Sequence, residues 1–205
     1  MKNERKKPMK KWLKAFIVCV VLALADGGLT LYNTPDLSME GNPLVARFHL
    51  GWGALITVNL IFLVIFFFAC RFIFERYQTR VFDVPNTRSY ISQLFYNRPD
   101  KFIWSFYRLP KNWTPAWACM CYAGYFGTSA GRVVVVLEWL AITFHVDMSG
   151  YNRFRTAYCF GRLDIVVVIV VSVASIFVWL RKEYQKSAEQ IANASADDLR
   201  KGMTN

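Results

Sequence analysis

The chain has 205 residues, of which 55% are apolar and 17% aromatic, and its formal net charge is +11. Soluble domains of this length carry more charge and shorter apolar runs, so the composition excludes a soluble globular fold. Seven Lys/Arg lie in residues 1–14, seven in 75–115 and five from Arg181 onward, whereas residues 33–43 have none. This asymmetry follows the positive-inside rule, so the basic excess indicates membrane topology and we expect no nucleic-acid partner.

The first apolar run predicts a membrane span at residues 12–32, preceded by a basic cytoplasmic tail at 1–11. Trp12 and Tyr32 would lie at the two interfaces. Asp26 lies roughly 9 Å inside the outer end, at 1.5 Å of rise per residue, with Thr30 one turn further out. The segment 33–42 is rich in turn-forming residues, which predicts a short outer turn.

The second span is predicted at residues 43–74, with Pro43 in its first turn. A helix of this length exceeds the ~30 Å hydrocarbon core and must tilt or project. Glu40 and Asn42 are expected to cap its N-terminus. Arg47 and His49 fall in its outer third.

Residues 75–115 form a basic, aromatic connection on the cytoplasmic side. Lys101, Ser105 and Arg108 share one helical face of it. Apolar side chains of Phe102, Phe106 and Leu109 share another, which predicts a short interfacial helix. The same composition would also suit docking of a partner protein.

The third span is predicted at residues 117–145, either as one helix or as an interfacial piece followed by a short span. Ala123, Gly127 and Gly131 repeat every four residues. This small-xxx-small spacing lets helices approach closely in lipid, so we expect these residues to pack against another helix.

The fourth span is predicted at residues 158–180, after a polar outer loop at 147–157. Arg162 and Asp164 lie near its outer start, and Arg181 and Lys182 end it at the inner face. The polar cytoplasmic tail, 183–205, is expected to be either helical or disordered. The sequence thus predicts an all-α four-span helix bundle, with one membrane domain at 12–182 and both termini cytoplasmic at the plasma (inner) membrane.

This topology collects the ionisable and polar residues of the four spans in the outer half of the membrane. The expected cluster is Asp26, Thr30, Glu40, Asn42, Arg47, His49, Glu138, His145, Arg162 and Asp164. Charged groups in a bilayer are costly and should face inward and pair.

Three interpretations of the cluster remain open. It can be a structural clamp of carboxylate–arginine pairs that holds four helices together. It can be an ion or proton path in which Asp26, Glu138 and His49 exchange protons. It can be a divalent-metal site, since His49, His145 and Asp26 are a suitable set of zinc ligands, although no local metal-binding motif is present.

The first turn also carries a resemblance. Asp26-x-x-Leu29-Thr30, followed by Glu40-x-Asn42-Pro43, resembles the signature of an uncharacterised family of small bacterial multi-pass membrane proteins. The resemblance covers about a quarter of the chain. It implies a four-helix membrane protein in which these residues act together, and it implies no activity.

The sequence therefore favours a non-enzymatic membrane protein that serves as a scaffold or as a subunit of a membrane assembly and could translocate a small ion. Its expected partners are the lipid bilayer and either copies of itself or other membrane proteins. No cofactor is expected. The alternative is a metal-dependent membrane enzyme that uses the outward-facing His/carboxylate set on a lipid-linked substrate.

Overall fold

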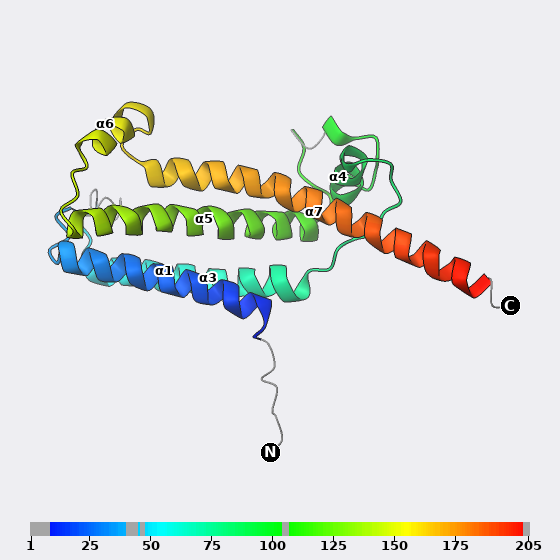
Figure 1. Cartoon of the computed structure of the whole chain (residues 1–205), viewed down its shortest axis with the longest axis horizontal. Coiled ribbons are helices and arrows are strands. Elements are labelled where there is room, and N and C mark those ends of the chain that lie inside the picture. The colour runs from blue at the N-terminus through cyan, green and yellow to red at the C-terminus, as the bar shows by residue number, and fades with distance from the viewer. Residues whose placement is uncertain (1–8, 40–44, 46–47, 104–106, 203–205) are drawn as a thin grey trace, which may run out of the picture. The chain divides into compact units, whose positions relative to one another are not determined.

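A computed structural model describes residues 9–39, 45, 48–103 and 107–202 of the chain (Figure 1). The described part is helical and contains no strand. Four of its helices are long and apolar enough to cross a membrane, as a multi-pass membrane protein requires. In chain order the elements are α1 (Lys11–Asn33), α3 (Trp52–Arg71), the π-helical turn η1 (Phe72–Arg76), α4 (Thr87–Tyr96), α5 (Trp113–Thr143), α6 (Ser149–Tyr158) and α7 (Leu163–Gly202).

The second apolar helix is shorter than the sequence predicts. It begins at Trp52, not at residue 43. The preceding residues prevent an earlier helical start, because His49 has a left-handed backbone with φ 51° and Gly51 is extended with φ −82° and ψ −168°. The expected capping residues Glu40 and Asn42, together with Arg47, lie outside the described residues.

The third apolar run forms one unbroken helix, α5, which decides between the two alternatives that the sequence leaves open. The predicted outer loop at 147–157 is instead mostly the helix α6. The last helix begins at Leu163, five residues after the predicted start, and continues without a break through the tail to Gly202.

The connection between α3 and α5 also differs from the prediction. Its α-helix lies at 87–96, where Asn86 caps the N-terminus by accepting a hydrogen bond from the Ser89 amide (2.9 Å). Asn97 ends the helix in a left-handed conformation with φ 59°. The described part agrees only in part with the interfacial helix predicted around 101–109, since Phe102 and Ile103 lie in a short 3₁₀ segment and residues 107–109 are not helical. Its central residues, 104–106, lie outside the described part.

The chain divides into two compact units, Met1–Glu75 with Gly124–Ser172, and Arg76–Ala123 with Val173–Asn205. In the first unit α1 packs against α3. Cys19, Cys70 and Tyr125 form its buried core, and Phe16, Phe66 and Phe74 pack around them. The Lys10 ammonium lies 2.7 Å from the Glu75 carboxylate at the end of this α1–α3 pair.

The second unit has an aromatic core. Tyr90 and Leu94 of α4 are fully buried. The Tyr90 ring contacts those of Phe82 (5.8 Å between centroids) and Tyr184 (5.7 Å). The Phe82 amide donates to the Ser187 hydroxyl of α7 at 3.0 Å. Part of the aromatic content of residues 75–115 is therefore used to build a folded core on α7.

Candidate functional site: the polar end of the first unit

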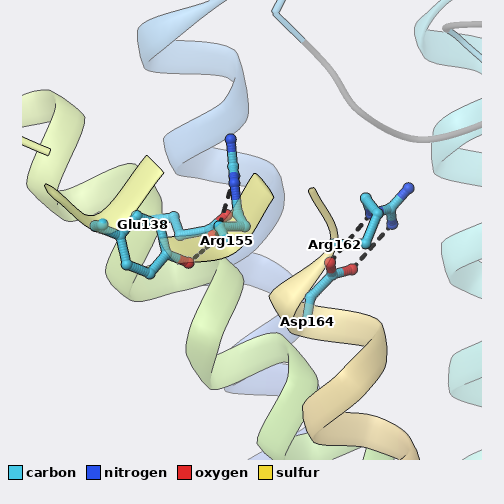
Figure 2. A network of polar contacts seen from close by, with 5 residues as sticks. Glu138, Arg155, Arg162 and Asp164 are labelled. Carbon is cyan, nitrogen blue, oxygen red and sulfur yellow. Dashed lines mark hydrogen bonds and ion pairs between the residues drawn. The ribbon is translucent and has the colours of Figure 1, made fainter. Parts of the chain in front are cut away.

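A half-buried cluster of polar side chains joins α5 to α6 in the first unit (Figure 2). The Tyr151 hydroxyl donates a hydrogen bond to Oε1 of Glu138. Nη1 of Arg155 lies 3.4 Å from the same oxygen, and the Arg155 and Glu138 side chains are 33% and 20% exposed. Burial, with the adjacent Glu138 carboxylate, raises the pKa of Tyr151, so its hydroxyl remains a donor at neutral pH.

A second ion pair lies at the start of α7. The Arg162 guanidinium binds the Asp164 carboxylate in a two-point contact, with Nε to Oδ1 at 3.1 Å and Nη2 to Oδ2 at 2.9 Å. Figure 2 shows the two side chains facing each other close to the Glu138–Arg155 pair. Asp164 also lies in the first turn of α7, where a negative charge interacts favourably with the helix dipole.

An uncharged contact joins the ends of α1 and α5. Nδ2 of Asn33 donates to Oγ1 of Thr143 at 2.9 Å, and the Thr143 hydroxyl lies 2.8 Å from the Trp139 carbonyl oxygen, to which it donates. Thr30, one turn before Asn33, is 2% exposed, and Asp26 is half-buried. Asn33 and Thr143 could not be predicted as partners, because single amides and hydroxyls near helix ends carry no distinctive sequence pattern.

The turn after α1 is held by Asp36. Oδ1 of Asp36 accepts hydrogen bonds from the Ser38 amide (3.2 Å), the Ser38 hydroxyl (2.9 Å) and the Thr34 hydroxyl (3.1 Å). These donors lower the pKa of the Asp36 carboxyl group. A hollow of about 480 Å³ lies beside this turn and is lined in part by Asp36, Ser38 and His49.

The two histidines are not brought together with a carboxylate. His49 and His145 both lie in exposed turns outside the helices, with left-handed φ values of 51° and 52°. Across the described residues, no three His, Cys, Asp or Glu side chains are grouped so that they could hold a metal ion. The geometry thus does not assemble the predicted ligand set of His49, His145 and Asp26.

Arg132 is a charged residue within the α5 span. Its Nη2 donates to Oδ1 of Asn59 on α3 at 2.7 Å. Its Nη1 and the Ser129 hydroxyl are buried, and neither has a hydrogen-bond partner in the described part of the chain. Both residues line a cavity of about 10 Å³ beside Cys19. Asn59 could not be predicted as the partner of Arg132, because one amide in an apolar run does not by itself indicate a polar contact.

Gly127 and Gly131 of α5 face α7 at close range. A Cβ atom on Gly127 would lie 2.0 Å from Ser172 Oγ and 2.8 Å from the Val168 carbonyl oxygen. A Cβ atom on Gly131 would lie 2.4 Å from Val168 Cγ2. This is the close helix approach that small-xxx-small spacing permits. Ala123, the third residue of the repeat, belongs to the second unit and is 6% exposed.

Comparisons of the chain with protein-family models, with curated proteins and with solved structures found no match.

Proposed function

We propose that this multi-pass membrane protein acts as a non-catalytic scaffold or subunit of a membrane assembly. The observation that supports this role is the pairing of carboxylates in the first unit. Glu138 is engaged by Arg155 and Tyr151, and Asp164 by Arg162. Pairing lowers the cost of placing ionisable groups in lipid. The contacts of Glu138 with Arg155 and Tyr151 also join α5 to α6. A carboxylate engaged in this way is poorly suited to serve as a general base or a metal ligand.

A proton path through Asp26, Glu138 and His49 receives little support from these contacts. Glu138 is held by an arginine and a tyrosine, and His49 lies in an exposed turn. The fixed positive charge of Arg132 within the α5 span opposes the passage of cations.

The apolar surface of α3 supports an assembly role. Large apolar side chains of this helix are exposed on the single chain, where they contact lipid or a neighbouring membrane helix: Ile56, Leu60, Ile61, Val64, Ile65 and Phe68. The partner in this proposal is a second copy or another membrane protein. The membrane is the plasma (inner) membrane, with both termini cytoplasmic, because the basic residues concentrate on that side.

The proposal is tested with the full-length chain in two assays. Cross-linking in intact membranes, followed by mass measurement after extraction, should give a discrete complex larger than one chain. Liposomes that contain the purified chain should show no proton or potassium flux above protein-free liposomes. A single chain with no cross-linked neighbour would contradict the scaffold role. If the liposomes show ion flux and Glu138→Gln abolishes it, the protein is a transporter and the scaffold role is wrong.

A further inference from the structure

A small pocket lies entirely within the second unit. Its volume is about 200 Å³. Phe95 and Tyr96 come from the end of α4, Arg108 from the following loop, and Ala116, Cys119 and Met120 from the first turns of α5. This volume is below the ~300–1,000 Å³ of sites for drug-sized ligands, so it fits one part of a larger molecule. Among the described residues, the lining is apolar and aromatic, and Arg108 is its one cation.

Hydrogen bonds hold the loop of this pocket in place. The Tyr96 hydroxyl donates to the Arg108 carbonyl oxygen at 2.7 Å. The Lys111 amide donates to the Phe95 carbonyl oxygen at 2.9 Å, and Nδ2 of Asn112 donates to the Leu94 carbonyl oxygen at 2.8 Å. The Arg108 guanidinium lies 5.6 Å from the Tyr107 ring centroid. The pocket is therefore formed before any ligand binds, which lowers the entropic cost of binding.

The position of the pocket on α5 places it at the membrane boundary. The candidate span begins at Trp113. Trp113 is 52% exposed, Trp117 54% and Met120 58%. Exposed tryptophans at the end of a span are typical of the headgroup level of the bilayer. The apolar wall of Ala116, Cys119 and Met120 lies on this span. Ala116 and Cys119 are 8% and 7% exposed, so a lipid reaches this wall from the side of the exposed Met120 side chain.

The sequence of the second unit around α4 and the start of α5 is basic, and Arg108 places one of its cations in the pocket lining. Residues 76–123 contain seven Lys/Arg against two acidic residues, Asp83 and Asp100. Basic pockets beside membrane helices suit phospholipid headgroups. A soluble anion would use the cation but would gain nothing from the apolar wall, whereas a phospholipid uses both.

We propose that this pocket binds one anionic phospholipid from the leaflet that faces residues 76–112. The Arg108 guanidinium binds the headgroup phosphate, and the upper acyl chain packs on Ala116, Cys119 and Met120. This site does not depend on the scaffold role proposed above. It makes the protein prefer membranes that contain anionic phospholipid.

The test uses the full-length chain, delipidated in detergent and titrated with phosphatidylglycerol or phosphatidylcholine while bound lipid is counted by native mass spectrometry. We expect one tight phosphatidylglycerol per chain, and at least tenfold weaker binding of phosphatidylcholine. Arg108→Gln should weaken phosphatidylglycerol binding at least tenfold. The control variant Arg98→Gln removes a positive charge from the same loop but outside the pocket. It should change the affinity for phosphatidylglycerol less than twofold.

A filling variant, Ala116→Leu, tests the apolar wall independently and should also weaken phosphatidylglycerol binding, with circular dichroism used to verify folding. Equal affinities for the two lipids, or equal effects of the two arginine variants, would overturn the site and indicate general attraction to anionic lipid. Full displacement of the lipid by millimolar glycerol phosphate would also overturn it, because the acyl chain would then contribute nothing.

Discussion

At the scale of single residues, the Glu138 carboxylate is the most heavily engaged group at the polar end of the first unit. It accepts a hydrogen bond from Tyr151 and pairs with Arg155, so two α6 side chains depend on one α5 side chain. Removing such a partner leaves the opposite charge partly buried without compensation, and this loss usually exceeds the net value of the pair.

We expect Glu138→Gln to lower the free energy of unfolding by about 1–3 kcal/mol, because Arg155 then keeps its charge without a counterion. Thermal unfolding in detergent measures the effect. Glu189→Gln on α7 is the matched control, since Glu189 is exposed, and it should leave the melting temperature unchanged. Equal melting temperatures for the two variants would show that the α5–α6 contact contributes no stability.

Tyr90 makes the second unit sensitive to alkali. Burial, with a smaller contribution from the Glu183 carboxylate, raises the pKa of its hydroxyl above the ordinary value of about 10. The folded state disfavours tyrosinate, so this part of the stability is complete below pH 10 and is lost as pH rises through the folded pKa. We expect Tyr90→Phe to flatten the fall in stability above pH 10, at the cost of the 2.9 Å hydrogen bond to the Arg80 carbonyl oxygen.

The measurement for Tyr90 is unfolding between pH 8 and pH 11.5, with tyrosinate absorbance recorded in parallel. The variant should be slightly less stable at pH 8, and its stability should decrease less steeply in alkali. Parallel curves for the variant and the parent chain would mean that Tyr90 does not titrate on unfolding.

At the scale of elements, the close contact between α5 and α7 depends on glycines, which have no Cβ atom. Gly127→Ala forces a Cβ atom to within 2.8 Å of the Val168 backbone oxygen, so the helices must move apart. We expect a loss of about 1–3 kcal/mol, as for other overpacked sites. Gly124→Ala is a matched control on the same helix, because nothing lies within 4 Å of its added Cβ, and it should be neutral or slightly stabilising.

Thermal unfolding of both alanine variants tests this contact. A Gly127→Ala protein as stable as Gly124→Ala would mean that α5 and α7 approach less closely than the Val168 contact requires.

The elements differ in how far the sequence could predict them. The four apolar stretches that form α1, α3, α5 and α7 are each long enough to cross the ~30 Å hydrocarbon core, so four candidate spans could be predicted from the sequence. The start of α3 depends on the backbone angles of His49 and Gly51, and the pattern of apolar residues in the sequence does not predict these angles. Helix α6 was missed because its short polar sequence also suits a loop. Helix α4 was not predicted because its buried residues pack against residues of α7 that are distant in the sequence, such as Tyr184.

The candidate site was less predictable for a similar reason. Topology places polar residues at a common depth but does not choose their partners. Tyr151 and Arg155 reach Glu138 only because residues 149–158 form a helix. The sequence places His49 and His145 at a similar depth in the membrane. In the structure they lie in separate exposed segments, His49 before α3 and His145 after α5.

At the scale of the whole molecule, four spans place the two termini on the same side of the membrane. Under the proposed topology, a fluorescent protein fused after Asn205 should fluoresce in the cytoplasm, and alkaline phosphatase fused after Met148 should be active outside. The sides follow from the positive-inside rule. Activity of both reporters on the same side would contradict a four-span arrangement. If each reporter is active only on the opposite side, the four spans are correct and the predicted orientation is reversed.

The π-helical turn at Phe72–Arg76 has a consequence for the evolution of the chain. A π turn contains one residue more than an α turn, as if a single residue had been inserted and absorbed without breaking the helix. Deleting Ile73 should therefore convert the π turn to an α turn and preserve the span, because an α turn covers nearly the same rotation with one residue fewer. Glu75 should then still face Lys10 and Arg71, which it contacts at 2.7 and 3.3 Å. A single-residue deletion at this point is therefore tolerated without reversing the direction that the Glu75 charge faces.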